Sequence, residues 1–93
     1  MQNKLKAADH LQAAVDLAMR WGLRDKEIVS ISANEHSGSL HIEPWAADAT
    51  KLSFKRRTKS SPHYTAMVGS VDVCFIDERR FYRELCEQQL TEA

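Results

Sequence analysis

Four histidines and two cysteines are the residues of this 93-residue chain that could hold a metal ion or support nucleophilic chemistry. His36 and His41 are close in the sequence, and Glu43 follows two residues after His41. If these residues lie on strands, His41 and Glu43 share one face, because side chains alternate along a strand. A zinc site usually has three or four protein ligands, and this pattern does not bring a third ligand to the two histidines. We therefore expect solvated strand histidines and neither a metal site nor a cofactor.

A nucleophilic enzyme would have to pair Cys74 or a serine with a histidine. The sequence has no nucleophile elbow, no GxGxxG and no phosphate-binding loop, and its three glycines are far apart. The neighbouring acids Asp77 and Glu78 are typical of a helix start rather than of a catalytic carboxylate pair. We expect a non-enzymatic protein, in which Cys74 and Cys86 are reduced thiols in or near the core of a cytoplasmic domain.

One segment is strongly basic, although the formal net charge of the chain is zero. Five cations fall within residues 51–59 without an acid among them: Lys51, Lys55, Arg56, Arg57 and Lys59. Such a segment could bind the phosphates of a nucleic acid. Edge strands also collect lysine and arginine to prevent unwanted pairing, and a neutral chain is not typical of a dedicated nucleic-acid binder. Neutrality, with a pI near 6.9, instead favours a protein partner or a homodimer.

The most regular stretch of the sequence predicts a β-hairpin. Apolar and polar residues alternate over residues 29–33 and again over residues 40–43, with a turn between them in which Gly38 is expected at positive φ. The register stays open: Ala33 faces either Ile42 or Leu40. Both registers bury the same face, formed by Val29, Ile31, Ala33, Leu40 and Ile42. The outer face carries Ser30, Ser32, His36, Ser39, His41 and Glu43.

The other elements follow from the same periodicities. A first helix begins at a cap on Asn3 and ends at a left-handed Gly22, with an apolar stripe of Leu5, Ala8, Leu11, Val15, Ala18 and Met19, and with His10 on its surface. Residues 51–55 alternate as a third strand, with Leu52 and Phe54 pointing inward. A second hairpin spans residues 63–76, turns at Gly69-Ser70, and pairs Val68 with Val71, Ala66 with Val73 and Tyr64 with Phe75. Asp77 caps a last helix with a buried stripe of Phe81, Leu85, Tyr82 and Cys86, closed by Leu90.

This order predicts one α+β domain over residues 1–93. Short connections favour an antiparallel sheet of about five strands in the order α-β-β-β-β-β-α, with both helices packed on its apolar face. No apolar run approaches the roughly 18 residues of a membrane span, so we expect no membrane contact.

Two stretches carry a resemblance to a known class of proteins. The segment from Ile31 to Ile42, ISANEHSGSLHI, and the later Tyr64 with Gly69-Ser70-Val71-Asp72-Val73 resemble small proteins carried by bacteriophages and prophages. Some proteins of that class are inhibitors of host defence systems, anti-CRISPR proteins included. The resemblance implies a mechanism in which another protein is bound and blocked, and it assigns no role to any residue.

The expected function is therefore protein binding, by a phage-type inhibitor or regulator. The expected docking surface is the outer face of the first hairpin, whose small and polar side chains need no burial: Ser30, Ser32, His41 and Glu43, with Trp45 at its margin. Tryptophan often dominates an interface. The alternative, that Trp45 folds back and caps the core beside the first helix, is the more usual arrangement, since large aromatic residues mostly bury in their own chain.

Overall fold

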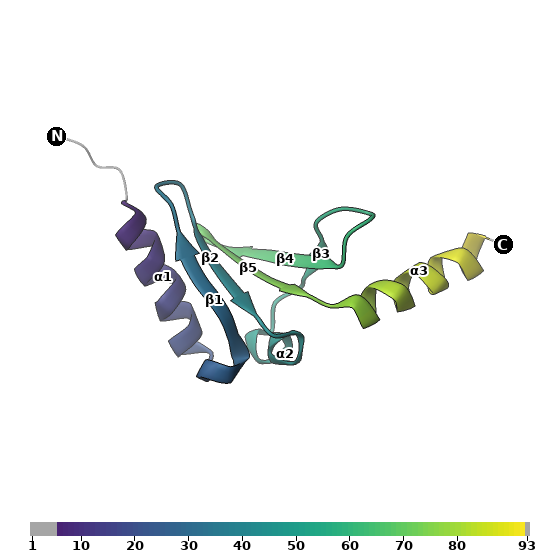
Figure 1. Ribbon diagram of the computed structural model, residues 1–93, viewed down its shortest axis with the longest axis horizontal. Helices are drawn as coiled ribbons and strands as arrows, with labels where there is room; N and C mark the ends of the chain where they lie inside the picture. The colour runs from purple at the N-terminus through teal and green to yellow at the C-terminus, as the bar shows by residue number, and fades with distance from the viewer. Residues whose placement is uncertain (1–5, 93) are drawn as a thin grey trace.

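The structure, a computed structural model, describes the backbone of residues 6–92 and the side chains of residues 6–88. The expected cap at Asn3 and the side chains of Leu5 and Leu90 lie outside the described residues. The elements, shown in Figure 1, are α1 (Ala7–Arg20), the 3-10 turn η1 (Asp25–Glu27), β1 (Ile28–Ala33), β2 (Gly38–Ile42), the 3-10 turn η2 (Pro44–Ala46), α2 (Ala47–Thr50), β3 (Lys55–Arg56), β4 (His63–Val68), β5 (Val71–Ile76) and α3 (Glu78–Glu92). The α+β fold and its five strands are confirmed.

The sheet has the strand order β1-β2-β5-β4-β3. All neighbouring strands run antiparallel except β2 and β5, which are parallel. The prediction of a wholly antiparallel sheet was therefore wrong. After β2 the chain passes through η2 and α2 to the far edge at β3 and returns through β4, so that β5 reaches β2 running in the same direction.

The first hairpin forms where expected, but neither expected register is correct. Ala33 lies opposite Gly38 and Ile31 opposite Leu40. The loop between the strands is closed by Asn34, whose Oδ1 accepts the backbone N–H groups of His36 at 2.7 Å and Ser37 at 2.9 Å. An asparagine that binds its own following backbone makes a turn without a glycine, and this is why Gly38 is free to enter β2.

Because of a bulge near the start of β1, one residue that was predicted to be buried is exposed. The register shifts between Ile28 and Ser30, so Ile28 packs against the core and Val29 is left 50% exposed. One extra residue in a strand reverses the faces of the residues before it, and strict alternation in the sequence does not reveal such a residue.

The second hairpin is confirmed in every predicted pair, with Val68 opposite Val71, Ala66 opposite Val73 and Tyr64 opposite Phe75. Gly69 has φ +61°, as the first position of a type II′ turn requires. The third strand is shorter than predicted, because only Lys55 and Arg56 pair with β4. Phe54 nevertheless points inward and lies edge-on to Phe75, with ring centroids 4.8 Å apart.

Helix α1 ends as predicted, with Gly22 at φ +67° and the N–H of Leu23 bonded to the carbonyl of Ala18 at 3.0 Å. Its buried face is rotated from the predicted stripe and consists of His10, Ala14, Leu17 and Ala18. The small side chains of Ala14 and Ala18 allow this face of the helix to approach the sheet closely. His10, expected on the surface, is buried, and its Nδ1 lies 2.9 Å from the Ser70 hydroxyl.

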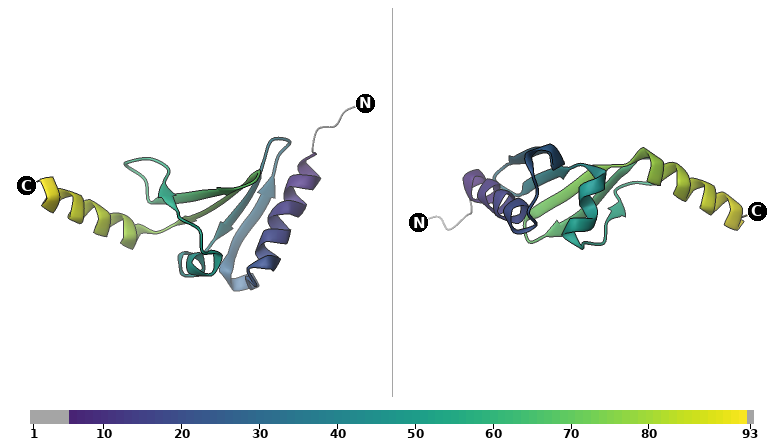
Figure 2. Two further views of the ribbon diagram at one scale, coloured as in Figure 1. Left: turned by 180° about the vertical axis from the view of Figure 1, so that it is seen from behind. Right: turned by 90° about the horizontal axis from the view of Figure 1, so that it is seen from below.

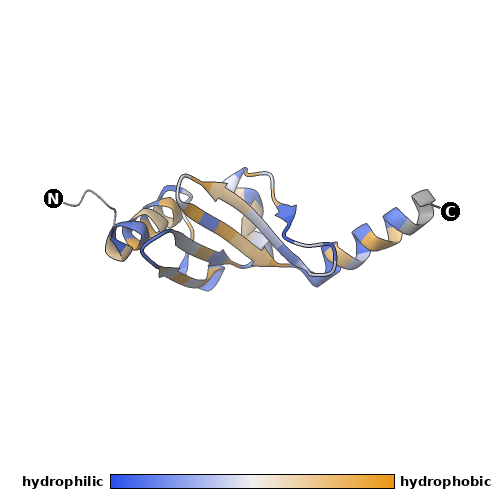
Figure 3. Ribbon diagram, turned by 90° about the horizontal axis from the view of Figure 1, so that it is seen from above, coloured by the Kyte–Doolittle hydropathy of each residue, from blue (hydrophilic) through white to orange (hydrophobic). Residues whose placement is uncertain are grey.

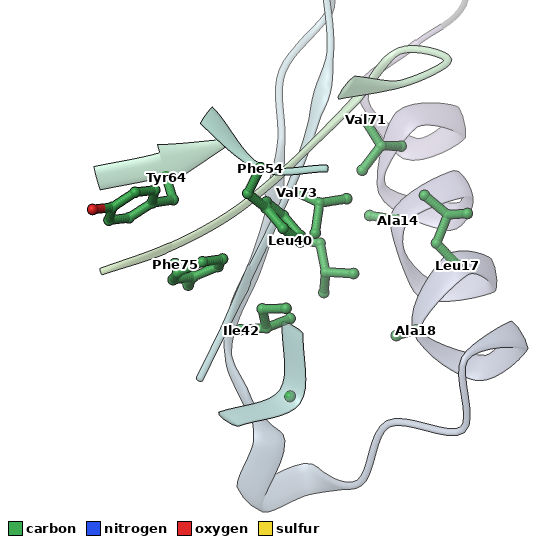
Figure 4. Packing of buried hydrophobic residues seen from close by; sticks show 11 residues of the cluster. Ala14, Leu17, Ala18, Leu40, Ile42, Phe54, Tyr64, Val71, Val73 and Phe75 are labelled. Atoms are coloured by element: carbon green, nitrogen blue, oxygen red, sulfur yellow. The ribbon is translucent and has the colours of Figure 1, made fainter. Parts of the chain in front are cut away.

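The core is a single cluster on one face of the sheet, drawn in Figure 4. Strands β2, β4 and β5 contribute Leu40, Ile42, Tyr64, Val71, Val73 and Phe75, α1 contributes Ala14, Leu17 and Ala18, and the segment after β2 contributes Ala46 and Phe54. The Tyr64 and Phe75 rings stack with centroids 5.3 Å apart. Helix α1 and the η2–α2 segment therefore cover the same face.

Helix α3 does not join that layer. Its cap is confirmed, since Asp77 Oδ1 accepts the N–H of Arg80 at 3.0 Å, and Phe81 is buried. Figures 1 and 2 show the helix projecting away from the sheet, and the molecule extends 59 Å along its longest axis. Of the predicted buried stripe, Phe81 is buried and Leu85 is half-buried, whereas Tyr82 and Cys86 are exposed. The prediction that both terminal helices pack on one face of the sheet was wrong. A single residue, Asp77, separates β5 from α3, which leaves no connection long enough to fold the helix back.

Candidate protein-binding surface

One face of the sheet is uncovered in the described part of the chain. Residues that alternate with the core lie on it: Ser30, Ser32, Ser39, His41, Thr65, Met67, Asp72, Cys74 and Ile76. We call this the open face. Met67 is 61% and Ile76 39% exposed there. In Figure 3 apolar residues colour much of the central strands, while polar residues mark the loops and alternate with apolar ones along α3.

The predicted docking residues of the first hairpin lie together at one side of the open face. Ser30 is opposite His41 across the β1–β2 ladder, and Ser32 is opposite Ser39. Both serines of β1 are exposed, whereas His41 is half-buried. Glu43 follows β2, and its N–H bonds the carbonyl of Glu27 at 2.9 Å, so it is half-buried beside the start of β1.

Trp45 is 64% exposed, and its neighbour Ala46 is 1% exposed. The expectation that Trp45 caps the core was therefore wrong. Pro44 begins η2 and holds the chain in a tight turn, which directs the alanine inward and the indole outward. Because transferring an aromatic side chain out of water is worth about 1.5–3 kcal/mol, the exposed indole is apolar surface that a partner could cover.

The middle of the open face is a network of polar contacts. Asp72 accepts hydrogen bonds from the Thr65 hydroxyl and from Arg57 Nη2, the latter at 2.6 Å. Cys74 lies beside it with the Ser39 hydroxyl as a hydrogen-bond partner. Burial raises the pKa of the Cys74 thiol, the Asp72 charge raises it further, and the Ser39 and Arg57 contacts offset only part of the effect. This thiol is therefore kept protonated and poorly nucleophilic.

The histidines do not converge. His36 lies in the hairpin loop, where its Nε2 is 3.3 Å from Glu35, whereas His41 is on β2. His63 Nδ1 is 3.3 Å from the Ser61 hydroxyl. Between residues 6 and 88, no three side chains of His, Cys, Asp or Glu come close enough together to hold a metal ion.

The basic segment is partly neutralised by the protein itself. Arg57 pairs with Asp72, and Arg56 Nε lies 3.6 Å from Glu84 Oε1. Lys51, Lys55 and Lys59 are exposed, and none of them has an ion-pair partner among the described side chains. Two of the five predicted phosphate-binding cations therefore have structural roles.

A cluster around Glu84 was not found from the sequence. Glu84 Oε1 accepts the Tyr64 hydroxyl at 2.8 Å, and Glu84 Oε2 accepts Arg80 Nε at 3.1 Å. The Arg80 guanidinium also lies 4.4 Å from the centre of the Tyr64 ring, a cation–π contact. Arg80 and Glu84 stand four residues apart on α3, a spacing that predicts their own pair, but nothing in the sequence assigns Tyr64 or Arg56 to them. The cluster fixes the first turns of α3 to β3 and β4.

Two pKa values in this cluster are perturbed. Burial and the hydrogen bond to Glu84 raise the pKa of Tyr64 to about 12. Burial alone would raise the pKa of Glu84, but the Tyr64 and Arg80 hydrogen bonds and the charges of Arg80 and Arg56 together hold it below its usual value. These shifts belong to a joint between a helix and the sheet, so they point to a structural role rather than to acid–base chemistry.

None of the described helices combines the length and apolar character needed to cross a membrane. No family model, curated protein or solved structure matches the chain. The resemblance to phage proteins stays a prediction, and the functional argument depends on the surfaces of this structure.

Proposed function

We propose that this protein acts without catalysis, by binding another protein through the outer face of its first hairpin, as phage-type inhibitors or regulators do. The binding surface comprises Ser30, Ser32, His41, Glu43 and Trp45. The exposed indole of Trp45 is the observation that carries the proposal. Single exposed apolar residues are common on proteins, but a tryptophan is a frequent anchor of protein interfaces.

The outer face of the first hairpin and the rest of the open face also support this assignment. Ser30 and Ser32 are short and exposed, so a partner can approach the strand backbone closely. The open face is not covered by any described element, and it adds Met67 and Ile76 as exposed apolar contacts further along the sheet.

The test compares Trp45→Ala with Tyr82→Ala, a matched control, because Tyr82 is 62% exposed but lies on α3. Both variants should keep the wild-type unfolding midpoint, since neither side chain is in the core. Only Trp45→Ala should weaken capture of a partner from lysate of the host. Strong destabilisation by Trp45→Ala, with unaltered capture by the folded fraction, would contradict the proposal.

Fluorescence gives a second, direct measurement. The chain has two tryptophans, so in a Trp21→Phe variant the emission reports Trp45 alone. Partner binding at this surface should move that emission to shorter wavelength as the indole leaves water. Binding of a captured partner without any change in emission would place the interface elsewhere.

The rival proposal is nucleic-acid binding through Lys51, Lys55, Arg56, Arg57 and Lys59. It has less support, because Arg56 and Arg57 are already paired with acids of the same chain.

A further inference from the structure

Strand β1 forms one edge of the sheet, and its outer side has no strand partner among the described residues. At the hairpin end, the N–H of Asn34 bonds the carbonyl of Ser37 at 2.9 Å. Hydrogen bonds alternate along an antiparallel ladder, so the N–H and C=O groups of Ser32 point toward β2 and those of Ile31 and Ala33 point outward. This edge therefore offers backbone donors and acceptors to another strand.

The exposed flank of α1 lies on the same side of the molecule. Helix α1 packs across β1 and β2, and its flank with Ala13, Asp16 and Arg20 borders the β4–β5 turn. Successive residues of a helix are about 100° apart, so the opposite flank faces the outer edge of β1. That flank is apolar and consists of Ala8, Leu11, Val15 and Met19. Met19 is 73% and Leu11 40% exposed.

The edge lacks most of the features that normally prevent strand pairing. Proteins protect exposed edges with lysine, proline, bulges or very short strands. Strand β1 has six residues, IVSISA, with no charge and no proline. Its bulge lies between Ile28 and Ser30 and leaves the remainder of the strand regular. The named residues of the backbone edge and of the apolar flank are all uncharged.

We propose that this surface binds a second copy of the chain, with the two β1 strands paired antiparallel across a two-fold axis and the two α1 flanks packed against each other. In a two-fold interface each residue lies near its own copy, so a charged surface repels itself. The named residues of this edge and flank carry no charge, which makes the surface compatible with its own copy. An antiparallel pair of identical strands satisfies the same backbone groups on both chains.

The test uses the full chain and two matched substitutions. Sedimentation equilibrium over a range of protein concentrations should show a dimer for the wild type. Met19→Lys should raise the dimer dissociation constant by about tenfold or more, because it places a charged lysine in the apolar α1 flank of each copy. Met67→Lys introduces the same charge at a comparably exposed methionine of the open face, and it should leave the dimer unchanged.

Amide hydrogen exchange then distinguishes strand pairing from contact between the helices alone. The amides of Ile31 and Ala33 should be protected in the wild type and exchange faster in Met19→Lys. The amides of Ser30 and Ser32 face β2 and should be protected in both proteins.

Three results would overturn the proposal. They are a wild type that stays monomeric at every concentration, equal weakening of the dimer by Met19→Lys and Met67→Lys, and a dimer in which Ile31 and Ala33 exchange freely. Failure of the dimer proposal is distinguishable from failure of the proposed protein-binding function. Trp45→Ala does not alter the dimer surface, and Met19→Lys does not alter the outer face of the hairpin.

Discussion

The backbone carbonyl of His10 in α1 lies directly against Gly38 of β2. A Cβ atom at residue 38 would be only 2.6 Å from that oxygen, so the helix can approach the sheet this closely only because residue 38 is glycine. The N–H of Gly38 also bonds the carbonyl of Ser70 at 2.9 Å, and the Ser70 hydroxyl meets the His10 ring. Helix α1, β2 and the β4–β5 turn are thus joined at one point.

Gly38→Ala should lower the free energy of unfolding by about 1–3 kcal/mol, the usual cost of overpacking, because backbone rather than a flexible side chain must move. Chemical denaturation measures this change. Ser32→Ala, on the exposed side of the neighbouring strand, is the control and should change stability by less than about 0.5 kcal/mol. A neutral Gly38→Ala would mean that α1 lies further from the sheet.

Phe75→Ala should cost about 3–5 kcal/mol, since the ring is 1% exposed and contacts both Phe54 and Tyr64. The adjacent Ile76→Ala, on the open face, should cost about 1 kcal/mol or less. Denaturant unfolding of the two variants compares the faces of β5 directly. Similar losses for both would show that β5 does not present residue 75 to the core.

Much of the sheet could be predicted because alternation and turn residues are local signals. The β4–β5 hairpin followed from Gly69 and from apolar residues at every second position, and Asp77 identified the start of α3. The features that the sequence did not reveal depend on contacts between distant segments. His10 and Gly38 meet only after α1 has packed on β2, and the parallel β2–β5 pair depends on the path through α2 and β3.

The candidate binding surface likewise has features that the sequence predicted and features that it did not. The polar outer face of the first hairpin was predictable from Ser30, Ser32 and His41, since a two-residue period separates the faces. The exposure of Trp45 was not, because it depends on which residue of a 3-10 turn points inward. The Glu84 cluster joins residues 56, 64, 80 and 84, and no local spacing links α3 to β3 and β4.

Tyr64 should titrate near pH 12 in the folded protein. In a Tyr82→Phe background Tyr64 is the only tyrosine, and ultraviolet difference absorbance follows its ionisation. Glu84→Gln should lower the pKa of Tyr64 toward its usual value, because the negative charge that opposes ionisation is gone while burial remains. An unchanged titration in Glu84→Gln would contradict the contact.

The same pKa shift predicts how stability depends on pH. The folded protein holds the phenol proton more tightly than the unfolded chain, in which tyrosine ionises near pH 10. The contribution of the protonated Tyr64 phenol to the free energy of unfolding is therefore complete below about pH 10 and is lost as the pH rises toward 12. Tyr64→Phe should lack this step in the dependence of unfolding free energy on pH.

The two cysteines should react at different rates with a thiol reagent. Cys86 is exposed on α3, whereas Cys74 is buried and its pKa is raised. The thiolate is the reactive form, so one thiol should react quickly and the other slowly until the protein is unfolded. Cys86→Ser should remove the fast phase, whereas disappearance of the fast phase in Cys74→Ser would reverse the assignment.

The basic segment gives the final prediction. Charge reversal at Arg56 or Arg57 would break their pairs with Glu84 and Asp72, so it would confuse loss of binding with loss of structure. Lys55 and Lys59 are exposed and without such pairs among the described side chains, and Lys55→Glu with Lys59→Glu therefore tests phosphate binding alone. Lys26→Glu, at an exposed lysine of η1, provides the control for a charge reversal outside the basic segment.

Under the proposed protein-binding function, the wild type should retain no single-stranded oligonucleotide at low salt in a fluorescence anisotropy titration. Nucleic-acid binding would give the opposite result, an affinity that falls steeply with salt because bound phosphates release counterions. The Lys55/Lys59 double variant would then flatten the slope of log affinity against log salt by roughly 0.7 for each phosphate of the single strand that it no longer neutralises. The Lys26→Glu control would keep the wild-type slope, since it lies outside the basic segment. That pattern would replace protein binding by nucleic-acid binding as the function of this chain.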